Sequence, residues 1–262
     1  MTGDTATKPN RHPGGTAMDA ADLLLAARRD PAKRLADLPD PVRPTELAGA
    51  YAIQHRVMSA LGPIGGWKVG ALAPEASPIC GALPASGILP SPAKLAAATH
   101  RMRGIEAEVA FRIGYDLPPR STPYAREEVM AAMATANPAI ETLESRYLDM
   151  DKVAMPSNIA DSQGHGGFIH GPGRADWQAI DFTRETVEQA IDGAAIQRTG
   201  NPAGDMVRLV VWLANVGSVW SGGLKAGQFV TCGSWTGKTL AGPAAKVRVR
   251  FPSLGEVALD YT

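Results

Sequence analysis

The stretch Ile105-Glu106-Ala107-Glu108-Val109-Ala110-Phe111-Arg112-Ile113 has an apolar side chain at every odd position. An alternation with a period of two is typical of a β-strand, whose successive side chains point to opposite faces of the sheet. The odd residues therefore predict a face that packs on the core, and Glu106 and Glu108 share the other face. Residues two apart on a strand are separated by about 6.5 Å, so both carboxylates can reach one cation.

A third acid, Glu141, lies in the predicted strand Ala139-Ile140-Glu141-Thr142-Leu143. The alternation places it on the more buried side, where an unpaired carboxylate is costly. The spacing of Glu106 and Glu108 alone favours a solvated sheet face over a metal site. The third acid, Glu141, makes a shared cation the better explanation. Three carboxylates without histidine or cysteine form an all-oxygen site, which prefers Mg²⁺ or Mn²⁺ to zinc.

The composition indicates a folded chain whose partner is a small molecule. Its 262 residues are 45% apolar, enough for a substantial core. Lysine plus arginine and aspartate plus glutamate number 26 each, so no net field favours nucleic acid or an anionic membrane. The two cysteines, Cys80 and Cys232, form no CxxC pair, which fits a reducing cytoplasm. No apolar run approaches the roughly 20 residues of a membrane span.

The sequence divides into three predicted regions. Residues 1–17 are rich in Thr, Pro, Gly and Asn and are predicted to form a flexible leader. Residues 18–62 are predicted to form an N-terminal helical arm, whose second helix is capped by Thr45. Residues 63–262 begin with short apolar runs between glycines and prolines and are predicted to form the main domain.

Within the main domain we expect three helices and several strands. The helices are predicted at 126–136, 184–191 and 205–220. Strands are predicted at 101–113, 139–147, 228–232, 246–251 and 256–261, and the last two are expected to form a hairpin across Pro252-Ser253-Leu254-Gly255.

Several segments follow one another in a characteristic order from about residue 19 to the C-terminus. They include Gly66-Trp67-Lys68-Val69-Gly70, Ile105 to Phe111, Pro138-Ala139-Ile140-Glu141, Asp161 with Gly166-Gly167-Phe168, and Gly233-Ser234-Trp235-Thr236-Gly237. Their order and spacing resemble the 2-keto-4-pentenoate hydratase / 4-oxalocrotonate decarboxylase branch of the fumarylacetoacetate hydrolase superfamily.

The resemblance implies an α+β fold, a mixed β-roll with flanking helices, in which residues 63–262 form the catalytic domain after the helical arm. It also implies a homo-oligomer and a Mg²⁺ or Mn²⁺ ion held by Glu106, Glu108 and Glu141. The implied activity is that of a lyase which hydrates a 2-hydroxyalka-2,4-dienoate to a 4-hydroxy-2-oxo acid. Alternatives are decarboxylation of a 2-oxo-dioate, carbon–carbon hydrolysis of an acylpyruvate, and a non-catalytic, repurposed binding protein.

The same resemblance suggests roles for further residues. Lys68 is expected to bind the substrate carboxylate or to relay a proton. Asp161 is expected to orient Lys68 or a metal-bound water, with a turn cap as the alternative. His165 stands where many members have a serine and is a candidate for proton transfer, with a backbone-bonded loop histidine as the alternative. Substrate-binding candidates in the last motif are Gly233, Ser234 and Thr236, whose alternative is a tight inter-strand loop.

Two departures from the family pattern bear on the reaction. Ile79 stands where many members have an acid, and Gly164 and His165 replace two serines. The first change removes a candidate acid-base side chain, and the second replaces the serines, so the chain lacks groups with which the family activates water in a hydratase.

Overall fold

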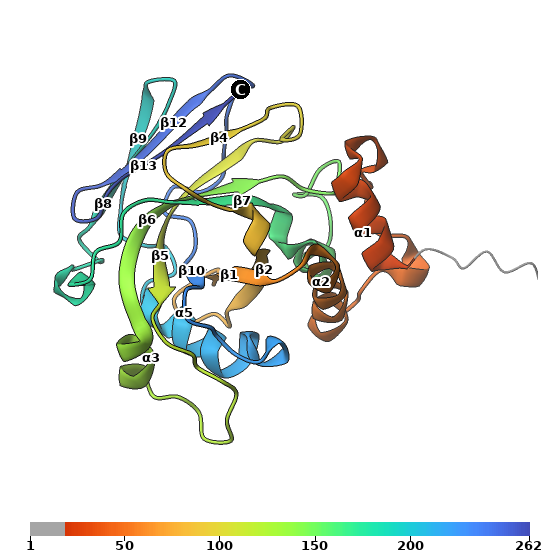
Figure 1. Ribbon diagram of the computed structural model, residues 1–262. Helices are drawn as coiled ribbons and strands as arrows, with labels where there is room; N and C mark the ends of the chain where they lie inside the picture. The colour runs from red at the N-terminus through yellow and green to blue at the C-terminus, as the bar shows by residue number, and fades with distance from the viewer. Residues whose placement is uncertain (1–18) are drawn as a thin grey trace, which may run out of the picture.

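The computed structural model describes residues 19–262, so the predicted leader at 1–17 lies outside the described residues. Two mixed β-sheets and short helices form the fold (Figure 1), which confirms the predicted α+β class. The larger sheet has eight strands: β1 (Ile64–Gly70), β2 (Ile79–Pro84), β3 (Ile88–Pro90), β5 (Gly104–Ile113), β6 (Met133–Leu143), β7 (His165–His170), β10 (Phe229–Thr231) and β11 (Thr239–Leu240).

The smaller sheet has five strands in the order β4-β13-β12-β8-β9. Its strands are β4 (Ala93–Leu95), β8 (Thr186–Ile191), β9 (Ala194–Thr199), β12 (Lys246–Phe251) and β13 (Gly255–Tyr261). The predicted hairpin is confirmed, since β12 and β13 pair antiparallel.

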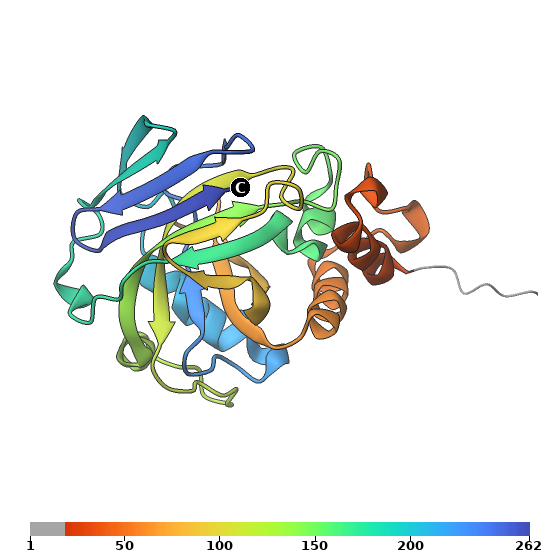
Figure 2. The same ribbon diagram turned by 45° about the horizontal axis from the view of Figure 1, so that its top comes forward.

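The α-helices are α1 (Ala20–Arg29), α2 (Leu47–Leu61), α3 (Arg126–Ala132), α4 (Met155–Ala160) and α5 (Met206–Trp212). α1 and α2 lie on the opposite side of the molecule from the β8–β9 hairpin in both views (Figures 1 and 2). Gln54 joins α2 to the main body, since its side-chain amide donates to Ile159 O at 2.7 Å and accepts from Ala82 N at 3.3 Å. The division into an arm and a catalytic domain stays a prediction.

The strand pair at the centre of the larger sheet follows the sequence alternation. The five odd apolar residues of β5 (Ile105, Ala107, Val109, Phe111 and Ile113) are at most 1% exposed, as predicted. The opposite face is buried as well, because Ala110 packs with Leu83, Ala139, Phe168 and Phe229 in a second small core. A solvated sheet face is therefore wrong as an explanation of Glu108, which is 2% exposed.

The helix predicted at 126–136 is too long. The structure ends α3 at Ala132 and begins β6 at Met133, so Asn137 and Pro138 lie inside a strand. The Pro138 carbonyl accepts from Gly171 N at 2.8 Å, just past the end of β7. In an antiparallel strand the N–H and C=O of one residue point to the same neighbour, so the N–H that proline lacks would point toward β7. Pro138 therefore costs no hydrogen bond to β5.

The helix predicted at 184–191 is wrong, because Thr186–Ile191 forms β8 between β9 and β12. Val187, Ala190 and Ile191 recur at helical spacing, but pairing with two neighbouring strands overrides this weak local preference. The predicted cap is also wrong: Glu46, not Thr45, precedes α2, and its side chain makes no capping hydrogen bond. The helix predicted at 205–220 is confirmed over α5, which continues into a short π-helix at Leu213–Gly217.

No helix within residues 19–262 has both the length and the apolar character needed to cross a membrane.

Candidate metal centre

The antiparallel register of β5 and β6 brings the three predicted acids together. Glu106 is the direct cross-strand partner of Glu141, and Glu108 lies one step along the same face. One carboxylate oxygen of each acid lies within 4.8 Å of the others. A single cation between them could therefore contact all three side chains.

Lys68 and His165 contact this cluster from two other strands of the same sheet. Lys68 Nζ, from β1, lies 2.8 Å from Glu141 Oε1. His165 Nδ1, at the start of β7, lies 3.1 Å from the same oxygen. The hydroxyl of Thr231, the register partner of Lys68 in β10, donates to Glu108 Oε2. The other oxygen of Glu141, Oε2, is buried and has no hydrogen-bond partner among residues 19–262, which leaves it free to bind an ion.

Burial and mutual repulsion perturb the acids in a way that a cation would relieve. Burial, Glu141 and Glu106 raise the pKa of Glu108 well above its ordinary value. Burial also raises the pKa of Glu106, against the opposing charge of Lys68. For Glu141, burial acts to raise the pKa, but Lys68 and His165 lower it overall. Burial likewise acts to lower the pKa of Lys68, but the surrounding carboxylates outweigh it and raise that pKa.

A cavity of about 270 Å³ opens beside the acids. Lys68, Glu106, Glu108, Gln163 and Ser234 are among its lining residues. Its walls hold polar atoms that are buried without hydrogen-bond partners among the described residues, including Gln163 Oε1 and Ser234 Oγ. Buried polar groups are rarely left unsatisfied unless a ligand, water or ion completes them.

The loop before β7 is strained where it meets this cavity. Ser162, Gln163 and Gly164 have consecutive positive φ angles of 49°, 54° and 72°. Only glycine adopts such angles without cost, and strained non-glycine residues concentrate at functional sites. Gly164 therefore allows the chain to turn into β7.

Asp161 has a different partner from the predicted one. Its carboxylate forms a buried ion pair with Arg146 and accepts from Ser145 Oγ at 3.2 Å and from Arg146 N at 3.0 Å. The structure therefore does not place this carboxylate on Lys68. Sequence reasoning missed Arg146, because the pairing depends on how the chain turns after β6.

The last motif is divided between two environments. Gly233, with a φ of 78°, and Ser234 line the cavity, as a substrate-binding role requires. The Thr236 hydroxyl instead accepts from Ala107 N at 3.2 Å and donates to Gln189 Oε1 at 2.8 Å. Thr236 is absent from the cavity lining and holds the loop against β5.

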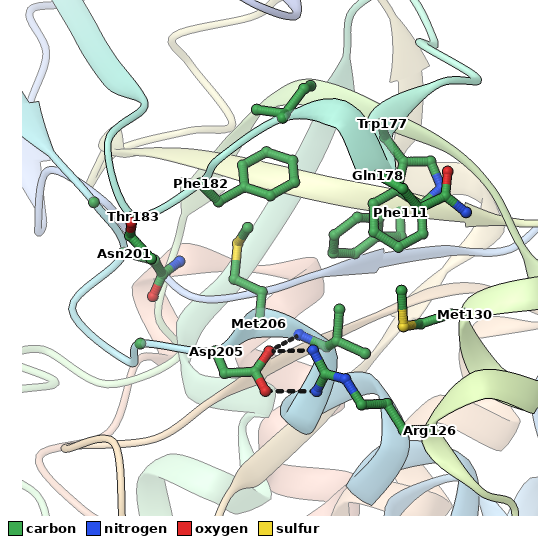
Figure 3. A pocket seen from close by; sticks show the side chains of 14 residues that line it. Phe111, Arg126, Met130, Trp177, Gln178, Phe182, Thr183, Asn201, Asp205 and Met206 are labelled. Carbon is green, nitrogen blue, oxygen red and sulfur yellow. Dashed lines mark hydrogen bonds and ion pairs between the residues drawn. The ribbon is translucent and has the colours of Figure 1, made fainter.

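A larger, more apolar cavity of about 480 Å³ lies on the other face of β5 (Figure 3). Phe111, whose side chain points away from the acids, lines it with Trp177, Phe182 and Met206. Several of its polar groups are already paired: Arg126 and Asp205 form an ion pair, and Trp177 Nε1 donates to Met133 O at 3.0 Å. This cavity has no carboxylate cluster, so the smaller one is the candidate active site.

Comparison with known proteins finds a similar sequence and similar folds. No protein-family model matches the chain. A 4-oxalocrotonate decarboxylase from a Pseudomonas species is 28% identical over 162 residues, which span 60% of each protein. The 4-oxalocrotonate decarboxylase of Pseudomonas putida G7, complexed with magnesium and adipate, superposes with a TM-score of 0.80 at 22% identity, covering 92% of this chain and 95% of that one.

A more distant structure has the same fold. The fumarylpyruvate hydrolase of Pseudomonas aeruginosa, in complex with Mn²⁺ and pyruvate, superposes with a TM-score of 0.55 at 16% identity, over 75% of this chain and 88% of that one. The fold predicted from the motifs is therefore confirmed.

Proposed function

We propose that this chain, which has the fold of the fumarylacetoacetate hydrolase superfamily, is a Mg²⁺- or Mn²⁺-dependent enzyme that removes carbon dioxide from a small 2-oxo-dioate. The observation that carries the proposal is the convergence of Glu106, Glu108 and Glu141 beside Lys68, at a cavity that Lys68, Glu106 and Glu108 line. The similarity to 4-oxalocrotonate decarboxylase in sequence and in structure favours decarboxylation. Hydration, the first expectation from the motifs, has no comparable support and takes second place.

The residues of the cluster fit a hard divalent ion. All three are oxygen donors, and Glu141 Oε2 is buried without a partner among residues 19–262. Glu106 and Glu108 hold their protons more tightly than ordinary carboxyls, as acids crowded together without a cation do. When bound, the ion would supply positive charge for the negative charge that develops on a 2-oxo group.

In this proposal Lys68 is the main acid-base and anchoring group. Its raised pKa keeps the ammonium charged at neutral pH, and it lines the cavity while its Nζ stays 2.8 Å from Glu141. Decarboxylation breaks the bond to the distal carboxylate, the electron pair moves through the conjugated system to the 2-oxo oxygen, and carbon dioxide leaves. Lys68 can bind the carboxylate that remains, or supply the proton that completes the product.

The neighbouring polar groups complete the site. His165 is fully buried and its Nδ1 contacts Glu141, so we propose that it orients that carboxylate. Gly233 and Ser234 offer backbone and hydroxyl groups to the substrate. Ile79, which lines the cavity in place of a family acid, offers no base for water, which suits loss of carbon dioxide better than hydration.

The test is a direct comparison of two reactions with the same preparation. Carbon dioxide release from a 2-oxo-dioate and hydration of a 2-hydroxyalka-2,4-dienoate are measured with Mg²⁺ and with EDTA. We expect Mg²⁺-dependent release of carbon dioxide and little hydration. Hydration alone would replace the decarboxylase with the hydratase, and metal binding without either reaction would favour a repurposed family member. The predicted homo-oligomer and cytoplasmic location stay predictions.

A further inference from the structure

A separate polar cavity of about 130 Å³ lies between α1 and the segment that follows β6. Three arginines line it: Arg28 on α1, Arg34 after the short turn Pro31–Lys33, and Arg146. It shares no lining residue with the cavity beside the acids. We call it the arginine cavity.

The charges in the arginine cavity do not balance. Arg34 pairs with Glu144, and Arg146 pairs with Asp161. Arg28 has no carboxylate partner among residues 19–262, and its Nη2 donates to His165 O at 3.2 Å. Three guanidinium groups therefore face two carboxylates. An arginine in a cavity is normally paired, because removing its charge from water is costly.

The excess positive charge falls on Arg28. Burial and the nearby charge of Arg146 lower the pKa of Arg28 to about 9, and Asp161 offsets only part of this. An anion in the cavity would offset the cost of burying the Arg28 charge beside Arg146. A guanidinium can hold a carboxylate or a phosphate with two parallel hydrogen bonds.

We propose that the arginine cavity binds a small oxyanion, a carboxylate or a phosphate, with Arg28 as its main ligand. The volume of about 130 Å³ equals that of about four water molecules at about 30 Å³ each. Inorganic phosphate or acetate fits this space.

The arginine cavity is connected to the candidate metal centre through His165. Arg28 and Arg146 both donate to His165 O, at 3.2 and 2.9 Å, while the ring of His165 contacts Glu141. The inference does not depend on which reaction the enzyme catalyses, because Arg28 touches none of the three acids.

The test is calorimetric titration of the full-length, EDTA-treated protein with inorganic phosphate and, separately, with acetate. Lys68 offers a second positive charge in the cavity beside the acids, so the uptake that is lost in Arg28→Gln is what reports the arginine cavity. We expect one site, and the anion bound more tightly identifies the ligand class. Arg28→Gln should weaken binding by about tenfold or more, because it removes charge-assisted hydrogen bonds. Arg29→Gln, a change at the exposed neighbour on α1, should leave binding unaltered.

A second variant guards against a folding defect. Arg28→Lys keeps the charge but loses the forked geometry, so we expect intermediate affinity and an unchanged melting curve. Absence of uptake of both anions by the native protein would overturn the proposal. Equal affinities in Arg28→Gln and Arg29→Gln would also overturn it.

Discussion

Replacing Glu108 with glutamine is the sharpest perturbation of the candidate metal centre. The two side chains have the same shape, and the amide oxygen of glutamine can still accept from Thr231. The change removes one negative charge from a cluster whose oxygens lie within 4.8 Å of one another. We therefore expect metal binding to be lost and the fold to be kept.

The size of the effect follows from Coulomb's law. Two unit charges about 4 Å apart interact by about 4 kcal/mol at an effective dielectric constant of about 20. A divalent ion doubles this, and the raised pKa of Glu108, which makes protons stronger competitors for its carboxylate, offsets part of the gain. A net loss of about 4 kcal/mol weakens Mg²⁺ binding about a thousandfold.

Thermal unfolding with and without Mg²⁺ measures this loss. At a concentration about 100 times its dissociation constant, Mg²⁺ stabilises the native protein by about 2.7 kcal/mol. For a chain of this size that raises Tm by about 5–10 °C. Glu108→Gln should show no rise at the same concentration, and its metal-free Tm should equal or exceed that of the native protein, because repulsion is relieved.

Glu256→Gln is the matched control, since Glu256 is an exposed acid on β13. It should keep the full Mg²⁺-dependent rise. If Glu108→Gln were stabilised by Mg²⁺ as much as the native protein, the assignment of Glu108 as a ligand would be refuted.

The remaining predictions concern the groups around the acids. Lys68→Ala should lower kcat about 100-fold or more while changing the Mg²⁺ dissociation constant less, and equal losses in assay and calorimetry would assign Lys68 a structural role. Mg²⁺ affinity should fall as pH falls, because protons compete for Glu108, whose pKa is raised by burial, by Glu141 and by Glu106. Since folded Glu108 binds a proton more tightly than the unfolded chain does, the stability of the metal-free protein should decrease as pH rises from the ordinary glutamate pKa toward the raised pKa of Glu108. Calorimetric Mg²⁺ titrations and thermal melts across pH check these two predictions, and a pH-independent Mg²⁺ affinity would contradict the prediction on binding. Arg146→Leu leaves Asp161 buried and unpaired, so urea unfolding should show a loss of about 3–5 kcal/mol, and a loss under about 1 kcal/mol would count against a buried pair.

The candidate site could be predicted from the sequence where it depends on local periodicity. The alternation in β5 places Glu106 and Glu108 on one face, and the same period aligns Glu141 in β6. The family motifs added Lys68, which no local pattern identifies. Both strands are long and regular, so their side-chain directions follow from the sequence.

What could not be predicted depends on contacts between distant segments. Thr231 donates to Glu108 across 123 positions of the chain. Val187 has apolar residues at helical spacing after it in the sequence, but it lies in a strand because β12 and β9 pair with β8. Asp161 pairs with Arg146 and not with Lys68, and the positions of these residues in the sequence do not reveal that pairing. In each case tertiary packing overrides the local signal.

The most direct test of the candidate metal centre is whether one divalent ion sits among the three carboxylates of the adjacent strands β5 and β6. Anomalous diffraction from crystals soaked in Mn²⁺ locates the ion without any assumption about substrate. We expect one strong manganese peak within coordination distance, about 2.0–2.2 Å, of oxygens of Glu106, Glu108 and Glu141. A manganese peak elsewhere in the molecule, or none in well-diffracting soaked crystals, would contradict it.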